Sequence, residues 1–296
     1  MQQLHRGMAL MLVFAALWAG EEALLGRLQG KVHVVQVVWM RFAIHLAVVW
    51  TLLAWRGQSL RWRPAALRRQ ALRAVALAAM PACWLLGLRS GADAVSMLTV
   101  FWLAPLLILL VGPRLFGPAA RLPAIGATAV GALGAWWLLG RDFPHAGEIL
   151  PPLGMALAFS AYVLLTVALR GESALANLFW LGLGVCVLLA PVLPVVWVMP
   201  GLRDLLVIAA VALVGLLGLW ALERAVAAGP LWPALPMVFM QLPCAMLLAL
   251  PHALHHPVDV TLGSLVIAVA AVAAWRLEAR RSAAVAPLRP QGAAAP

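Results

Sequence analysis

Charged side chains are scarce in this sequence. Only 10% of its 296 residues are Asp, Glu, Lys or Arg, whereas 65% are apolar. An ordinary soluble domain carries roughly 25% charged residues. The polar residues here are too few to cover the outside of a soluble protein of this length, because the whole surface would have to face water. The composition therefore excludes a soluble globular protein and predicts a membrane protein.

Motifs of known chemistry are also missing. Cys83, Cys186 and Cys244 lie singly in apolar runs, without the CxxC spacing of a metal site or the even number of a disulfide framework. No GxxxxGK[ST] segment is present, which argues against an ATP-driven pump within the chain. No Asp-rich motif is present to hold Mg²⁺ for chemistry on phosphates. We expect no cofactor and no enzyme activity, with a polytopic membrane enzyme acting on a lipid or polyprenyl substrate as the alternative.

The segment "PHALHHPVDV" is the only His-rich stretch. It holds His252, His255, His256 and Asp259, and such a group could ligate a transition metal. The segment also holds two prolines and has no evident second half of a site. We interpret it as a solvated loop and assign no metal to the protein.

Ten apolar segments are long enough to cross a bilayer. A hydrocarbon core of about 30 Å requires about 20 residues of helix. The predicted spans are Gly7–Gly26, Val34–Trp55, Ala71–Leu88, Ala92–Val111, Leu122–Leu139, Leu150–Leu169, Leu175–Met199, Leu205–Ala228, Leu231–Leu250 and Val260–Trp275. Pro191 and Pro194 late in the seventh segment, with Pro200 directly after it, predict one tilted helix with an irregular end. The expected fold class is therefore an all-α polytopic membrane protein.

Basic residues outnumber acidic ones, and the formal net charge is +11. They show no stripe interleaved with aromatics, so we expect no nucleic-acid partner. They gather between the second and third spans and at the C-terminus, as Arg56, Arg61, Arg63, Arg68, Arg69, Arg73, Arg276, Arg280, Arg281 and Arg289. The positive-inside rule then places both termini in the cytoplasm. We expect a multi-pass protein of a bacterial cytoplasmic (inner) membrane, with residues 282–296 forming a disordered cytoplasmic tail of Ala and Pro.

The sequence also aligns with itself at an offset of 138 residues. The segment "LLGLRSGADAVSMLTVFWLAPLLILL" from Leu85 matches "ERAVAAGPLWPALPMVFMQLPCAMLL" from Glu223, and Pro105 falls on Pro243. Five spans separate the two segments, so they enter the membrane from opposite sides. This pattern is typical of inverted repeats, whose interface forms a central site.

These features together resemble the EamA-like family of the drug/metabolite transporter superfamily. The resemblance rests on "ALWAG" ending at Gly20, "WMRFAIHL" with Arg41, the small-residue turn "LRSGADAV", "WLAPLLILL" with Pro105, and the matching turn and Pro243. It covers nearly the whole chain.

The resemblance implies ten helices in two inverted five-helix repeats around a central cavity, spanning residues 1–139 and 150–281. It implies a secondary transporter that moves a small amino-acid-like, amphipathic or cationic metabolite, by export and alternating access. Proton coupling and a homodimer are left open.

Two adjacent glutamates near the end of the first span are the strongest candidate site residues. Glu21 and Glu22 lie roughly 7 Å from the outer end of their helix, and Arg41 lies roughly 11 Å deep in the second span from the same side. Neighbouring residues on a helix point about 100° apart, so only one glutamate can pair with Arg41. We hypothesise that the cavity-facing glutamate and Arg41 exchange between each other and substrate or proton. A static ion pair near the interface is the other interpretation.

His45 lies one turn below Arg41 on the same helix face. It could bind substrate or titrate near neutral pH. It could equally be a neutral core histidine that donates one hydrogen bond to a carbonyl.

Several aromatic and polar residues lie inside spans rather than at their ends. Trp and Tyr usually gather at the membrane interfaces. Mid-span examples could line a cavity and stack on flat or cationic substrates, or they could simply pack. They are Trp18, Trp102, Trp220, Trp232, Tyr162 and Gln241. The matched prolines Pro105 and Pro243 are expected to bend their helices where the halves meet.

Glu223 and Arg224 lie near the cytoplasmic end of the eighth span. Their depth suggests an interfacial pair or a gate anchor, and simple snorkelling to the interface is the alternative.

Overall fold

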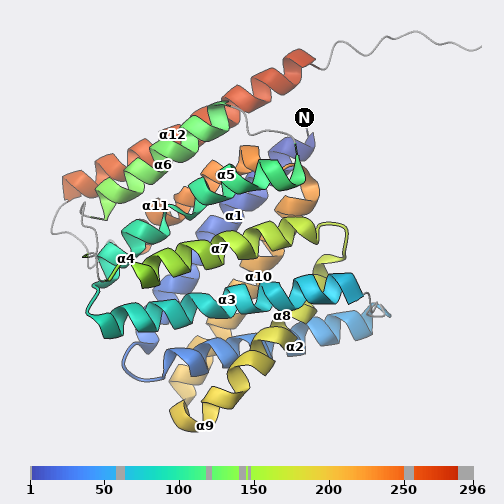
Figure 1. Cartoon of the computed structure of the whole chain (residues 1–296), viewed down its shortest axis with the longest axis vertical. Helices are drawn as coiled ribbons and strands as arrows, with labels where there is room; N and C mark the ends of the chain where they lie inside the picture. Colours follow the sequence, from blue (N-terminus) through green and yellow to red (C-terminus); the bar gives the residue numbers. More distant parts are fainter. Residues whose placement is uncertain are drawn as a thin grey trace, which may run out of the picture.

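The computed structural model describes residues 2–57, 64–117, 122–139, 145, 148–249 and 257–285, and these residues form helices without any strand (Figure 1). The elements are α1 (Gln2–Leu25), the 3₁₀ turn η1 (Gly26–Leu28), α2 (Val34–Trp55), α3 (Pro64–Ser90), α4 (Ala94–Phe101), α5 (Ala104–Phe116), α6 (Leu122–Leu138), α7 (Leu150–Ala168), α8 (Ala174–Leu189), the 3₁₀ turn η2 (Ala190–Val192), α9 (Leu193–Val196), α10 (Leu202–Ala228), the 3₁₀ helix η3 (Trp232–Met240), α11 (Gln241–Ala249) and α12 (Pro257–Val285).

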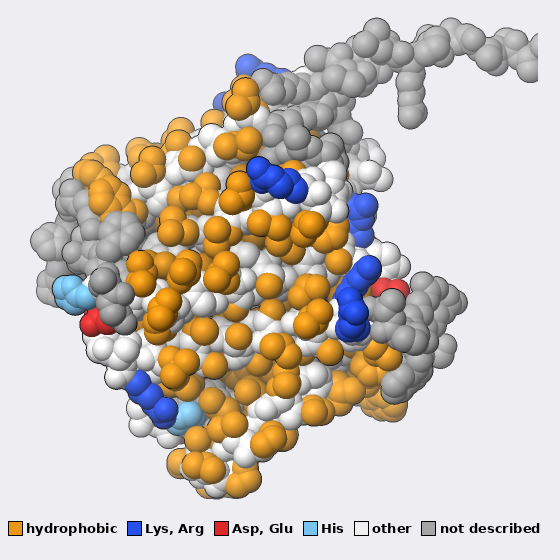
Figure 2. Space-filling view, viewed as in Figure 1, with side chains coloured by type: hydrophobic (Ala, Val, Ile, Leu, Met, Phe, Trp, Pro, Cys, Tyr) orange, Lys and Arg blue, Asp and Glu red, His pale blue; other side chains and the backbone are white. Residues whose placement is uncertain are grey.

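The described part of the chain contains eight helical stretches that are long and apolar enough to cross a membrane. Two shorter apolar stretches, Leu122–Leu138 and Trp232–Leu248, coincide with two further predicted spans. Apolar side chains cover the face drawn in Figure 2. Large ones such as Trp55 and Leu122 are 79% and 80% exposed. An uninterrupted apolar surface of this kind suits lipid and not water. The protein is therefore an all-α polytopic membrane protein.

The predicted ends of α2 are correct, whereas α1, α3, α10 and α12 are longer than predicted, α3 and α12 by the most. α3 begins at Pro64 instead of Ala71, and α12 continues to Val285, past the predicted end at Trp275. Residues 282–285 of the predicted tail are thus helical, and residues 286–296 lie outside the described part. In both cases the prediction ends the helix where arginines begin. A helix can continue beyond the apolar core, however, because long basic side chains extend their charged ends to the membrane interface.

Prolines divide three of the predicted helices. The fourth span is interrupted at Trp102 and Leu103, between α4 and α5. The seventh has the expected irregular end, because α8 gives way to η2 and the short α9 around Pro191 and Pro194. The ninth is a 3₁₀ helix over its first half, η3. Proline lacks an N–H and clashes with the carbonyl four residues earlier, so closely spaced prolines disfavour a regular α-helix.

Helices from the two ends of the sequence pack against each other. α1 lies against α10, and α7 lies against α3. α6 and α12 run side by side along one edge of the molecule, and α2 packs on α8 near the opposite edge (Figure 1). The ends of α3 and α10 are related by the same 138-residue offset as the sequence match.

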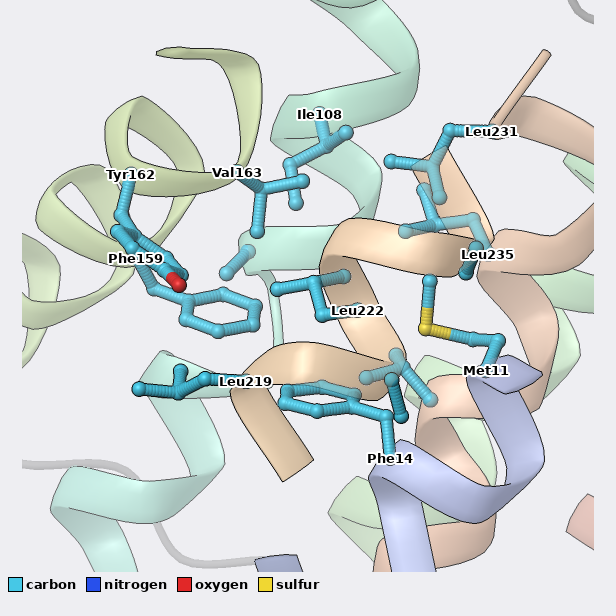
Figure 3. Packing of buried hydrophobic residues seen from close by; sticks show 14 of the residues in the cluster. Met11, Phe14, Ile108, Phe159, Tyr162, Val163, Leu219, Leu222, Leu231 and Leu235 are labelled. Atoms are coloured by element: carbon cyan, nitrogen blue, oxygen red, sulfur yellow. The ribbon is translucent and has the colours of Figure 1, made fainter. Parts of the chain in front are cut away.

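The main core lies where α1, α7, α10 and the η3 region meet. Figure 3 shows Met11 and Phe14 of α1 facing Leu219 and Leu222 of α10, with Phe159 of α7 beside them. The packing therefore joins segments that are more than 200 residues apart in the sequence.

Asp93 caps the first helix of the divided fourth span. One carboxylate oxygen accepts hydrogen bonds from the backbone N–H groups of Val95 and Ser96, each at 2.9 Å. Hydrogen bonds from Ser96, and then from Val95, hold the pKa of Asp93 below its ordinary value of 3.8. A depressed folded-state pKa means that the ionised cap stabilises the protein at neutral pH and that this contribution is lost below pH 3.8.

We expect Asp93→Ala to destabilise the protein by about 1 kcal/mol, the usual cost of losing an N-cap. The measurement is thermal unfolding of the detergent-solubilised protein at pH 7. Asp93→Asn, which keeps an oxygen acceptor, is the control and should remain close to wild type. Equal melting temperatures for wild type and Asp93→Ala would contradict the capping role.

Candidate functional site

Glu21 of α1 and Arg41 of α2 form an ion pair. Arg41 Nη1 donates to Glu21 Oε1, and the carboxylate side chain is only 9% exposed. The two helices are joined by a short connection through η1 and run antiparallel, which brings the two residues to one depth. The pairing expected from the sequence is present, and its glutamate is Glu21.

A glycine in α10 makes room for this pair. A Cβ atom added to Gly215 would lie 2.6 Å from Arg41 Nη2 and 2.8 Å from Glu21 Oε2. These separations are too short for any real contact. α10 therefore closes directly over the pair only because position 215 has no side chain.

Glu22 points away from Arg41 and has a different environment. It is exposed, and its carboxylate accepts a hydrogen bond from Nε2 of the buried Gln241 in α11. Trp18 lies one turn earlier on the same face of α1. No described Arg, Lys or His side chain forms an ion pair with Glu22. Glu22 is therefore an acidic side chain without a cationic partner among the described residues.

His45 is buried beneath the ion pair. Its Nε2 lies 2.7 Å from the backbone oxygen of Ala212, so this nitrogen donates a hydrogen bond. Its ring packs edge-on against Phe42, with centroids 4.8 Å apart, and the guanidinium of Arg41 lies 5.1 Å from the same ring. This geometry agrees with the core-histidine interpretation. The histidine supports the contact between α2 and α10.

Trp18 and Trp102 meet in an aromatic cluster next to Glu22. Their ring centroids are 5.8 Å apart, and Phe159 of α7 lies 5.3 Å from Trp18. Phe239 of η3 lies 5.5 Å from Trp102. Trp102 occupies the interruption between α4 and α5, so the broken backbone is what brings this ring to the cluster. The cluster thus contains rings from both halves of the sequence.

Trp220 and Trp232 lie elsewhere. Trp220 of α10 is 42% exposed on the outside, and Trp232 donates from its indole N–H to the backbone oxygen of Gly117 at 3.1 Å. Neither belongs to the aromatic cluster, which agrees with packing roles.

Pro105 and Pro243 both lie just after a change of helix geometry. Pro105 is the second residue of α5, and Pro243 is the third residue of α11, after η3. The backbone oxygen of Ala104 accepts a hydrogen bond from Ser160 Oγ of α7 at 3.2 Å. A side chain from a neighbouring helix thus bonds to the backbone beside Pro105, as interrupted helices in membranes require.

Tyr162 belongs to a second polar cluster, which the sequence did not reveal. Arg73 Nη1 donates to Glu223 Oε1 at 2.5 Å, and Arg73 Nη2 donates to the backbone oxygen of Asn177 at 2.7 Å. Asn177 Nδ2 donates to Glu223 Oε2 at 2.8 Å, and Gln70 Nε2 donates to Asn177 Oδ1 at 2.6 Å. The Arg73 guanidinium lies 5.7 Å from the Tyr162 ring centroid. We call these five residues the Arg73 network.

Two sequence interpretations need correction at this network. Arg73 was assigned to a cytoplasmic connection, but it lies nine residues inside α3 and is fully buried. Glu223 does not pair with Arg224, whose guanidinium instead lies 6.0 Å from the ring of Trp220. Adjacent helical residues point in different directions, so Glu223 faces the interior while Arg224 faces outward. The sequence did contain one signal of this network. Asn177 is a polar residue inside the apolar seventh span, and it could have indicated a polar partner on another helix.

The His-rich segment cannot be placed. His252, His255 and His256 lie outside the described residues, and only the backbone of Asp259 is described. Among the side chains that are described, no group of three or more His, Cys, Asp or Glu is arranged to hold a metal ion.

Comparison with known proteins identifies the fold and nothing more specific. No family model and no curated protein matches the chain. A solved structure described only as "Crystal structure of protein" superposes with a TM-score of 0.78 at 19% sequence identity, covering 95% of this chain and 99% of that one. The part of the chain that superposes therefore has a fold already observed experimentally.

We expect Gly215→Ala to force Arg41 and Glu21 apart and to destabilise the protein by about 1–3 kcal/mol, as overpacking does. Thermal unfolding in detergent measures the change. Gly218→Ala, one turn further along α10, is the matched control, because its Cβ would lie an ordinary 3.6 Å from Leu17 Cβ. A Gly215→Ala protein as stable as Gly218→Ala would show that α10 does not close over the pair.

Proposed function

We propose that this protein is a secondary transporter for a small metabolite, built from ten membrane spans in two inverted five-helix repeats. Residues 1–139 would form the first repeat and residues 150–281 the second. The packing supports this arrangement, because the contact of α1 with α10 has its counterpart in the contact of α7 with α3. Gly91 and Gly229, which precede the two divided helices, both have positive φ.

The observation that carries the proposal is the exposed carboxylate of Glu22. An ionised side chain facing lipid costs several kcal/mol, so a glutamate in an apolar helix indicates contact with a water-filled path. Glu22 accepts a hydrogen bond from Gln241 and has no cationic partner among the described residues. Trp18, one turn earlier in α1, packs against Trp102. A carboxylate beside aromatic rings favours a compound with a positively charged amine and an apolar body. Amino-acid-like, amphipathic and cationic metabolites have this chemistry.

The two glutamates would have different roles in transport. Glu21 stays paired with Arg41 and holds α1, α2 and α10 together. Glu22 exchanges its hydrogen-bonding partner Gln241 for the substrate amine, and a proton competes for the same carboxylate. From the sequence we expected the cavity-facing glutamate and Arg41 to exchange between each other and substrate or proton. In this proposal only Glu22 makes such an exchange, and Arg41 stays paired with Glu21.

The proposed orientation and the proposed direction of transport rest on the sequence. The distribution of arginines supports cytoplasmic termini in a bacterial inner membrane. The family resemblance supports export by alternating access. No membrane-enzyme chemistry is needed to explain the arrangement of Glu22, Gln241 and the tryptophans.

The test is transport of a mixed metabolite panel by proteoliposomes, with and without an imposed pH gradient. We expect Glu22→Gln to lower gradient-driven flux at least tenfold while the protein remains as stable as wild type, because Glu22 has no ionic partner to lose. Glu21→Gln should lower the melting temperature, because it leaves a poorly exposed Arg41 without its counter-charge.

Normal flux in a stable Glu22→Gln protein would contradict the role of Glu22. Absence of flux of every amine in wild type, with the protein folded, would contradict the transporter proposal itself.

A further inference from the structure

The Arg73 network is a deeply buried group of polar side chains. Arg73 is 0% exposed, Asn177 1%, Gln70 3% and Glu223 4%. Tyr162, whose ring lies beside the guanidinium, is also fully buried. Apolar side chains at these positions would fill the same space without needing any hydrogen bonds. Packing of the fold therefore does not by itself explain why these positions hold polar residues.

The network lies at the other end of the aromatic core from Glu22. Gly215, next to the Glu21–Arg41 pair, and Glu223 are both on α10 and are eight residues apart, or about 12 Å along the helix axis. Leu219 and Leu222 lie between them and pack with Phe14 and Phe159 (Figure 3). A path that enters at Glu22 would therefore meet the aromatic core first and the network afterwards.

The network also ties the two proposed repeats together. Arg73 and Gln70 come from α3 in the first repeat, whereas Asn177 and Glu223 come from α8 and α10 in the second. Asn177 Nδ2 additionally lies 3.3 Å from the backbone oxygen of Leu169, at the end of α7. One ion pair with its bridging amide thus connects four helices at a single depth.

Stability alone is a poor explanation for this arrangement. The desolvation of two buried charges often cancels their attraction, and apolar residues of similar volume can stabilise a core as well or better. Arg73 Nε, Tyr162 Oη and Gln70 Oε1 are buried and have no hydrogen-bonding partner within the described structure. Unsatisfied buried groups of this kind cost free energy. A transporter has to open and close each end of its path. Polar side chains that close one end can separate and bind water when that end opens, whereas apolar side chains cannot.

We propose that the Arg73 network is the closure of the transport path at the end opposite Glu22, and that separation of Arg73 from Glu223 opens this end. The inference rests on the proposed transport function. Glu22 is exposed while the network is sealed, so the present conformation is open toward Glu22 and closed at the network. By the arginine distribution, the closed end is the cytoplasmic one.

The test is the accessibility of a cysteine placed behind the closure. Leu219 of α10 is 6% exposed and lies one turn before Glu223, on the Glu22 side of the network, so Leu219→Cys is the reporter in a protein whose three native cysteines are replaced by alanine. A membrane-impermeant thiol reagent is applied to the network side of vesicles of known orientation. Glu223→Gln, which keeps a side-chain acceptor for Asn177 but removes the ionic attraction, should raise the modification rate at least tenfold.

Three further variants make the result specific. The charge exchange Arg73→Glu with Glu223→Arg should restore the low rate. Asn177→Ala, which removes the bridge but keeps both charges, should raise the rate severalfold and covers the case in which Glu223→Gln does not fold. Glu21→Gln breaks the other ion pair and should leave the rate on the network side unchanged.

Unchanged modification rates in folded Glu223→Gln or Asn177→Ala would overturn the closure. Because the assay needs no substrate, its outcome is separate from that of the transport assay. Altered accessibility in a protein that moves no solute would retain the closure and reject the transporter proposal.

Discussion

A charge buried in a membrane protein must find its partner inside the protein, because the bilayer core supplies neither water nor counter-ions. Much of this structure can be understood from that requirement. Glu21 pairs with Arg41 and Glu223 with Arg73, and both of these ion pairs lie against α10. Gly215 receives the first pair from α1 and α2, and Glu223 accepts the second from α3. α10 is therefore the helix around which the others are arranged.

The two adjacent glutamates show how a helix gives neighbouring identical residues different chemistry. A rotation of about 100° turns Glu21 toward Arg41 and Glu22 toward Gln241 and open space. The first carboxylate is neutralised and structural. The second has no cationic partner in the described structure and accepts a hydrogen bond from Gln241, and this difference is what makes it the better candidate for contact with a solute.

Interrupted helices contribute as much to the site as the regular ones. The interruption at Trp102 and Leu103 carries an aromatic ring into the centre, and η3 presents Phe239 to it from the other half of the chain. Prolines near both interruptions prevent a regular helix, and neighbouring side chains such as Ser160 bond to the backbone there. The divided helices thus form the contact between the two halves, while α6, α12, α2 and α8 lie at the edges (Figure 1).

The sequence by itself determined the membrane class, the position of most spans and the pairing of a glutamate with Arg41. Hydrophobicity is a local property of a run of residues, and Glu21 and Arg41 lie on consecutive helices joined by a short turn, so their meeting needs only local geometry. The tertiary structure alone decided which glutamate pairs with Arg41, because α1 is apolar on all sides and has no polar stripe that would show how the helix is oriented. It also decided that Arg73 meets Glu223, since 150 residues separate them and no local pattern connects them. Arg73, which the sequence places in a loop, lies in the core because two distant helices meet its charge. Glu223 of α10 and the backbone oxygen of Asn177 in α8 accept its hydrogen bonds, and Asn177 Nδ2 donates to Glu223.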